Sequence, residues 1–138
     1  MDRRALIGTI TVFVVWMAGS YLVHGVLLHG DYAQFPTLYR TQTETQALMP
    51  ILVAAHGLLA GAFTWIYARG TEAKPWIPQG LRYGLAVACL TVIPTYSITY
   101  VVQPLTSTLV MRQITLDTLL LLVLGLVVAY IYRNKRTA

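Results

Sequence analysis

Four long apolar stretches dominate the pattern of hydrophobic and polar positions along this chain. They run from about Ala5 to His29, Ala47 to Ala68, Leu81 to Val102 and Leu116 to Tyr132. Each has close to the ~20 apolar residues that an α-helix needs to cross ~30 Å of hydrocarbon. The loops between them are too short to fold alone. The pattern therefore predicts one all-α integral membrane domain over residues 1–138, built as an antiparallel bundle of four transmembrane helices.

Composition supports the membrane interpretation independently. Hydrophobic residues make up 57% of the chain and charged residues 11%, whereas charged residues are about a quarter of a typical soluble domain. The net charge of +5 is spread over the ends of the apolar stretches, where basic side chains meet anionic lipid headgroups. We therefore expect the lipid bilayer, and no nucleic acid, as a partner. Cys89 is the single cysteine, which excludes an intrachain disulfide and a cysteine metal cluster.

The positive charges predict how the chain is oriented in the membrane. Eight of them lie before the first stretch, between the second and third or at the start of the third, or after the fourth: Arg3, Arg4, Arg69, Lys74, Arg82, Arg133, Lys135 and Arg136. Arg40 and Arg112 are the two that lie on the other side. Since cytoplasmic loops carry the excess of lysine and arginine, both termini should be cytoplasmic. We call the side that holds Arg40 the outer side.

Small residues recur at helical spacing in the second and third stretches. Ala54, Gly57 and Gly61 follow one line of the second, and Gly84 and Ala88 follow one line of the third. Small residues let helix backbones approach closely, which is how transmembrane helices associate when lipid offers no hydrophobic drive. We expect all five to pack against neighbouring helices. The fourth stretch is mostly leucine and valine, so we expect it to face lipid most.

The polar side chains that could bind a ligand collect toward the outer side. They are His24, His56, Tyr96, Tyr100, Arg40 and Asp117, and the outer loop adds Tyr32 and Tyr39. Polar groups at membrane depth usually face the bundle interior or a cavity, so these residues could together line one outward-facing pocket. Each also has a plainer interpretation. The histidines could be hydrogen-bonded packing residues, and Asp117 could form an interfacial charge pair with Arg112.

Several familiar chemistries lack their parts in this sequence. No HExxH, CxxC, GxSxG or glycine-rich phosphate loop occurs, which excludes the usual metalloprotease, thiol redox, esterase and nucleotide motifs. His24 and His29 are five residues apart and so about 140° apart around a helix, which removes the simplest metal site on one helix. We predict no catalytic residue and no metal ligand set.

Four segments carry a family resemblance. They are HGVLLHGDY (24–32), LYR (38–40), GLRYG (80–84) and the proline and tyrosine pattern between Pro94 and Pro104. With them the chain resembles a family of small, uncharacterised four-span bacterial membrane proteins over nearly its whole length. The resemblance implies a multi-pass protein of the bacterial inner membrane, and it brings no activity, substrate or site residue.

Three functions are compatible with these features. The leading interpretation is a non-enzymatic accessory or scaffold subunit of a larger membrane assembly, with a membrane protein or a second copy as partner. The small-residue lines and short loops favour it. The first alternative is a binder of a cofactor or small lipophilic ligand, with haem, a quinone or a metal held near His24 and His56. The second is a small membrane enzyme or carrier for a lipophilic substrate.

Overall fold

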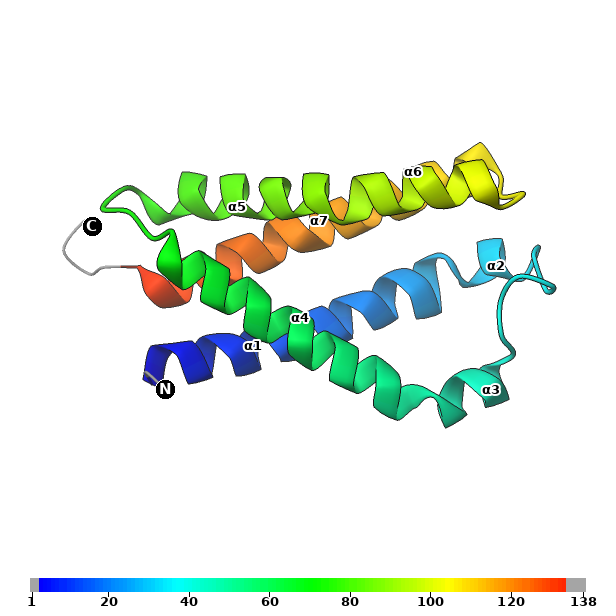
Figure 1. The fold of residues 1–138 in the computed structure, drawn as a ribbon, viewed down its shortest axis with the longest axis horizontal. Helices are drawn as coiled ribbons and strands as arrows, with labels where there is room; N and C mark the ends of the chain where they lie inside the picture. The colour runs from blue at the N-terminus through cyan, green and yellow to red at the C-terminus, as the bar shows by residue number, and fades with distance from the viewer. Residues whose placement is uncertain (1–2, 134–138) are drawn as a thin grey trace.

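The computed structural model describes residues 3–133, and every regular element among them is a helix. The segments in chain order are α1 (Arg3–Ser20), η1 (Tyr21–Leu27), α2 (His29–Tyr32), α3 (Gln42–Ala47), α4 (Met49–Arg69), α5 (Trp76–Leu90), α6 (Val92–Val102) and α7 (Ser107–Tyr132). The beginning of α1 and the end of α7 lie at the same end of the molecule (Figure 1). We call that end the inner end, and the opposite end, with α2 and α3, the outer end.

Four helical stretches are long and apolar enough to cross a membrane, which confirms the predicted number of spans. They are Arg3–Leu27, Met49–Arg69, Trp76–Val102 and Ser107–Tyr132. The third and fourth begin earlier than hydropathy alone predicted. In α7 the hydroxyl of Thr106 accepts a hydrogen bond from the Leu109 N–H and so caps a first turn that contains polar residues. A search for apolar runs does not detect polar helix ends of this kind.

The third span bends between α5 and α6. Pro94 has no backbone N–H and cannot donate to the Leu90 carbonyl, so the helical hydrogen bonding is interrupted there. Thr91 occupies the junction, where its N–H and its hydroxyl both bond to the Val87 carbonyl. After this junction α6 runs along the outer half of α7, while α5 runs along its inner half (Figure 1).

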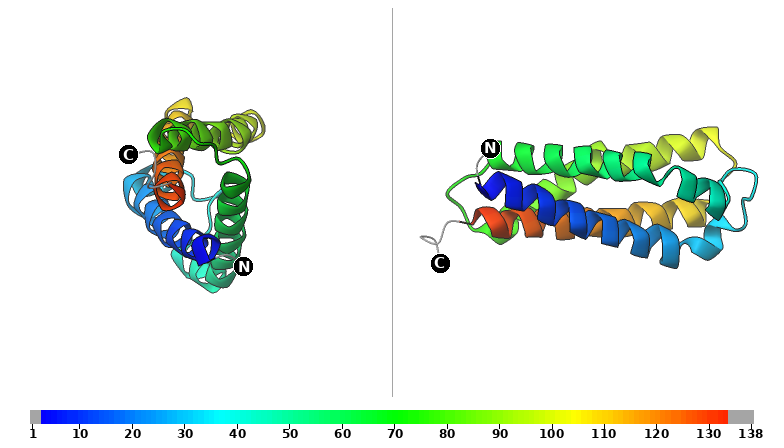
Figure 2. Two further views of the ribbon diagram at one scale, coloured as in Figure 1. Left: turned by 90° about the vertical axis from the view of Figure 1, so that its left-hand side faces the viewer. Right: turned by 90° about the horizontal axis from the view of Figure 1, so that it is seen from below.

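α7 is the central helix of the bundle, so the expectation that it faces lipid most is wrong. It lies between α5 and α6 on one side and α1 on the other (Figure 2). Its apolar stretch is also more buried than those of the other three spans. Leucine and valine are as suited to helix packing as to lipid contact, which is why composition alone pointed the wrong way.

Glycines bring α5 and α7 into backbone contact. A Cβ added to Gly84 would lie 2.4 Å from the Leu121 carbonyl oxygen, and one added to Gly125 would lie 2.2 Å from the Gly80 carbonyl oxygen. Neither backbone could move aside without separating the helices. Ala88, one turn beyond Gly84, is fully buried. The predicted packing role of Gly84 and Ala88 therefore corresponds to the α5–α7 contact.

α4 packs on the bundle through a different face from the predicted one. Its buried residues are His56, Ala60, Phe63, Thr64 and Tyr67. Ala54 is exposed, and a Cβ on Gly57 or Gly61 would meet no atom within 4 Å. The close contact expected at Ala54, Gly57 and Gly61 is thus absent within the described chain. We call these three residues and the exposed Leu58 the open face of α4.

Candidate functional site

Polar side chains from four helical segments meet inside the outer half of the bundle. They are His24 on η1, Tyr32 on α2, Tyr96 on α6, and Gln113 and Asp117 on α7. We call these five residues the outer polar cluster. Four of them, His24, Tyr32, Tyr96 and Asp117, belong to the pocket predicted from the sequence. The cluster joins elements that are far apart along the chain, so it positions the outer ends of three of the four spans.

The π-helical segment η1 presents His24 to the cluster. Its wider turn ends where the Leu28 N–H bonds to the Val23 carbonyl, five residues back, at 2.9 Å. The two imidazole nitrogens then reach different partners. Nδ1 lies 2.7 Å from the Tyr32 hydroxyl oxygen, and Nε2 lies 3.3 Å from Asp117 Oδ1. π-Helical segments are frequent at functional sites because the inserted residue redirects neighbouring side chains.

Asp117 is buried and accepts a second hydrogen bond. The Tyr96 hydroxyl donates to its Oδ2 at 2.6 Å, a short distance typical of bonds to a carboxylate. One carboxylate oxygen thus faces His24 and the other faces Tyr96. The aspartate therefore holds η1 and α6 against α7.

The hydrogen bonds around Tyr32 form a chain in which Gln113 donates to Tyr32 and Tyr32 donates to His24. The Gln113 amide Nε2 donates to the Tyr32 hydroxyl at 3.2 Å, which leaves the hydroxyl proton for His24 Nδ1. The imidazole then carries its own proton on Nε2, facing Asp117. Burial raises the pKa of Tyr32 to about 12, so this phenol stays a donor at neutral pH. Gln113 Oε1 is the one side-chain atom of the cluster that is buried without a hydrogen-bond partner among the described residues.

Arg112 pairs with Asp31 on α2 rather than with Asp117. The Nη1 to Oδ2 distance is 2.7 Å, so the sequence-based pairing of Arg112 with Asp117 is wrong. Arg112 and Gln113 are neighbours on α7, and a rotation of about 100° per residue turns one toward α2 and the other into the cluster. The Asp31 pair joins α2 to α7 beside the residues of the cluster.

His56 lies apart from His24 in a separate environment. Its Nε2 is 3.1 Å from Ser20 Oγ, and its Nδ1 is 2.9 Å from the Leu52 carbonyl oxygen. The ring also meets Trp16 edge to face. Both nitrogens of each histidine are therefore engaged by protein groups, and the donor set does not fit a bis-histidine haem. Among residues 3–133 no three His, Cys, Asp or Glu side chains are grouped to hold a metal ion.

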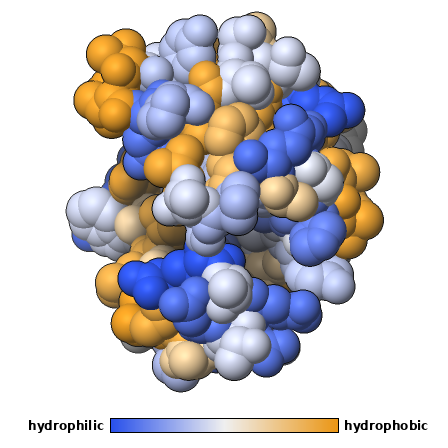
Figure 3. Space-filling view, turned by 90° about the vertical axis from the view of Figure 1, so that its right-hand side faces the viewer, coloured by the Kyte–Doolittle hydropathy of each residue, from blue (hydrophilic) through white to orange (hydrophobic). Residues whose placement is uncertain are grey.

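Two further predicted site residues lie outside the cluster. Tyr100 is exposed on α6, four residues beyond Tyr96, and Arg40 is exposed in the loop before α3. Tyr39 of the outer loop, which the sequence also assigned to the pocket, packs its ring on that of Tyr32 with 4.6 Å between centroids. Figure 3 shows the outer end, where hydrophilic residues cover most of the centre and hydrophobic residues lie mainly around the rim.

Gln113 and Asp31 are the site residues that sequence reasoning missed. Gln113 lies four residues before Asp117, so both occupy one face of a helix. That spacing was a usable signal, but the fourth span was predicted to begin only at Leu116. Asp31 has no such signal because its partner Arg112 lies 81 residues away in the sequence.

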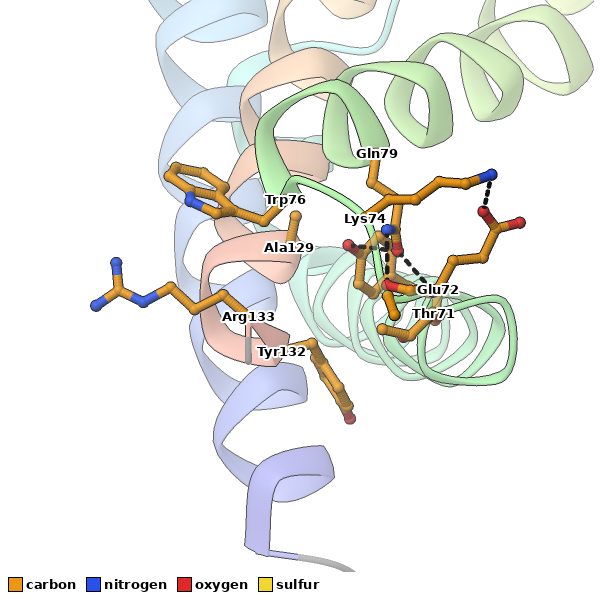
Figure 4. Close-up of a pocket in the computed structure, with 10 residues that line it drawn as sticks. Thr71, Glu72, Lys74, Trp76, Gln79, Ala129, Tyr132 and Arg133 are labelled. Carbon is orange, nitrogen blue, oxygen red and sulfur yellow. Dashed lines mark hydrogen bonds and ion pairs between the residues drawn. The ribbon is translucent and has the colours of Figure 1, made fainter. Parts of the chain in front are cut away.

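A hollow at the inner end is too small for a ligand. Its space is about 20 Å³, enough for a water molecule. Gln79 closes the adjoining turn, because its amide accepts from the Glu72 N–H and donates to the Glu72 carbonyl, both at 3.1 Å (Figure 4). Lys74 pairs with the Glu72 carboxylate beside it. These hydrogen bonds and this ion pair stabilise the turn between α4 and α5, beside which the hollow lies.

An open groove of about 600 Å³ runs between the end of η1 and the first half of α7. Leu27 and Leu28 form one wall, and α7 residues from Ser107 to Leu116 form the other. The groove lies beside the outer polar cluster, and Arg112 stands on its α7 wall.

No family model, curated protein or solved structure matches this chain.

Proposed function

We propose that this protein is a non-enzymatic accessory subunit of a membrane assembly and that it receives a transmembrane helix of a partner protein on the open face of α4. The proposal places it in the bacterial inner membrane as a multi-pass protein, with both termini in the cytoplasm. The family resemblance supports the bacterial membrane, and the predominance of arginine and lysine at the inner end supports the orientation.

The observation that carries the proposal is the unused glycine pair on α4. Gly8, Gly19, Gly80, Gly84 and Gly125 all stand within 3 Å of a neighbouring segment when a Cβ is added to them. Gly57 and Gly61 lie one turn apart on a transmembrane helix and meet nothing within 4 Å. A GxxxG pair lets two helices approach closely and is enriched at helix contacts in membranes. A contact with a helix outside this chain would give the pair the same use as those five glycines.

The packing of α4 leaves room for such a helix. The residues from Met49 to Ala55 are all exposed, and α4 contacts the bundle mainly where it crosses α1. Leu58, between the two glycines along the helix, is 77% exposed. A partner helix could therefore lie along the outer half of α4 without displacing α1.

Photocrosslinking in intact membranes tests the proposal. A photoreactive amino acid at Leu58 should give a discrete protein adduct, whereas the same group at Val101 on α6, which is 82% exposed, should react with lipid alone. Mass spectrometry of the adduct identifies the partner. Equal lipid labelling at both positions, with no protein adduct from Leu58, would overturn the proposal, and an adduct with a second copy of the chain would replace the accessory role by self-association.

The buried Gln113 Oε1 favours a second candidate function. An acceptor without a partner inside a membrane costs free energy, and a small lipophilic ligand with a hydroxyl or N–H donor would satisfy it. A hydroquinone has such donors and the corresponding quinone does not. This function predicts that a hydroquinone, and not its quinone, raises the melting temperature of the wild-type chain, and that Gln113→Leu abolishes the increase. The same response to both compounds would exclude it.

A further inference from the structure

The groove between η1 and α7 has an apolar floor and a polar rim. Leu27, Met111 and Leu116 supply the apolar surface, while Leu28 lies buried behind it. Thr115 adds to it, since its hydroxyl bonds back to the Met111 carbonyl at 2.8 Å and so offers little to a ligand. The volume of about 600 Å³ lies within the range of small-molecule binding sites, about 300–1,000 Å³.

The groove is oriented like a lipid of the outer leaflet. Its α7 wall begins at Ser107, the first residue of the helix at the outer end, and reaches Leu116. Nine residues at 1.5 Å each give a length of roughly 14 Å along the helix. The hydroxyls of Ser107 and Thr108 lie at the start of this length and the leucine at its end. A molecule with a polar head and an apolar chain therefore fits in one direction only.

The exposed charge on the rim is positive. Arg112 gives a hydrogen bond to Asp31, but its side chain is 57% exposed while that of Asp31 is 18% exposed. A guanidinium has five N–H donors in a planar fork, so donors remain after the Asp31 contact. Arginine binds phosphate oxygens with paired, charge-assisted hydrogen bonds. The rim thus complements a phosphate, with Asp31 holding the guanidinium from behind.

We infer that this groove binds one phospholipid of the outer leaflet. The phosphate lies on Arg112 near Ser107 and Thr108, and one acyl chain follows Leu27, Met111 and Leu116. The positive charge of Arg112 favours a phospholipid over an uncharged lipid. The apolar floor of the groove favours a lipid over free phosphate.

Native mass spectrometry of the full chain in detergent can measure this binding. The probes are phosphatidylglycerol, diacylglycerol with the same acyl chains, and inorganic phosphate. We expect phosphatidylglycerol to bind roughly tenfold more tightly than diacylglycerol, the scale of one charge-assisted contact. Equal binding of the two lipids would overturn the inference, and so would displacement of phosphatidylglycerol by an equal concentration of inorganic phosphate.

Three variants separate lipid binding from a structural role of Arg112. Arg112→Gln should abolish the preference for phosphatidylglycerol, and Thr115→Trp should weaken both lipids by filling the groove while it leaves the Arg112 and Asp31 pair intact. Asp31→Asn should keep the preference, because the guanidinium remains. If Asp31→Asn loses the preference as fully as Arg112→Gln does, the pair is structural and the inference fails.

A matched control removes an arginine elsewhere. Arg82 is exposed on α5 near the inner end, so Arg82→Gln changes the net charge equally and should leave the preference unchanged. Loss of the preference in Arg82→Gln would show that overall charge, and not the groove, selects the lipid.

Discussion

Tyr96 donates its hydroxyl proton to the Asp117 carboxylate across 2.6 Å and so ties α6 to α7. The same carboxylate faces His24 on η1 at 3.3 Å. α6 has no buried residue, and within the described part of the chain this hydrogen bond is the one that links an α6 side chain to another helix. Hydrogen bonds between transmembrane helices contribute about 0.6–2 kcal/mol, enough to decide where the outer half of the third span lies.

Tyr96→Phe should lower the stability of the bundle by about 1 kcal/mol, since Asp117 loses one of its two donors while the ring stays in place. The measurement is the melting temperature in detergent. Tyr100→Phe is the matched control, because that tyrosine is exposed and should be neutral. Equal effects of the two substitutions would show that the Tyr96 contact contributes nothing specific.

Glycine substitutions should have different effects at a helix contact, such as Gly84, and on the open face of α4, such as Gly57. Gly84→Leu should destabilise the bundle by about 1–3 kcal/mol or more, since its side chain would meet the α7 backbone. Gly57→Leu should leave the melting temperature of the isolated chain unchanged, because a Cβ there meets no atom within 4 Å. A marked loss of stability in Gly57→Leu would mean that a neighbouring helix does cover this face.

Reporter fusions test the orientation. Fusions after Gln79 and after Ala138 should report a cytoplasmic location, and a fusion near Thr43 an external one, as the eight-to-two distribution of basic residues requires. A cytoplasmic signal from the fusion near Thr43 would invert the orientation of the bundle.

Tyr32 should ionise only at strongly alkaline pH. Burial raises its pKa from the ordinary 10.0 to about 12, so the folded chain keeps its proton after the unfolded chain has lost it. The stability that the neutral phenol confers is complete below pH 10 and falls as the pH rises toward about 12. The difference in phenolate absorbance between the wild type and Tyr32→Phe should show a midpoint near the upper value. A midpoint near 10 would place Tyr32 in water.

Hydropathy predicted the number and class of the spans correctly because burial in lipid imposes a length and an apolar composition on every helix. It failed on which helix is central. Leu121 and Leu124 pack inside the bundle, whereas Leu119 on the same helix is exposed, and the residue type is the same in each case. The residue type at a position on a helix therefore carries little information about which other helices pack against that position.

Part of the site was predictable because polar side chains at membrane depth usually face the interior of the bundle. Depth in the membrane singled out His24, Tyr96 and Asp117, which the structure joins. The spacing could not show that His56 turns toward Ser20, because that depends on where α1 and α4 cross. Nor could it reveal the π-helical turn that aims His24.

The accessory role is tested most directly by the mass of the complex that the chain forms when it is extracted at its native abundance in mild detergent. The account predicts that the wild-type chain migrates with a partner, and that Gly61→Leu migrates alone while its melting temperature is unchanged. A wild-type chain that migrates alone, or a Gly61→Leu variant that keeps its partner, would contradict the claim that the open face of α4 receives another helix.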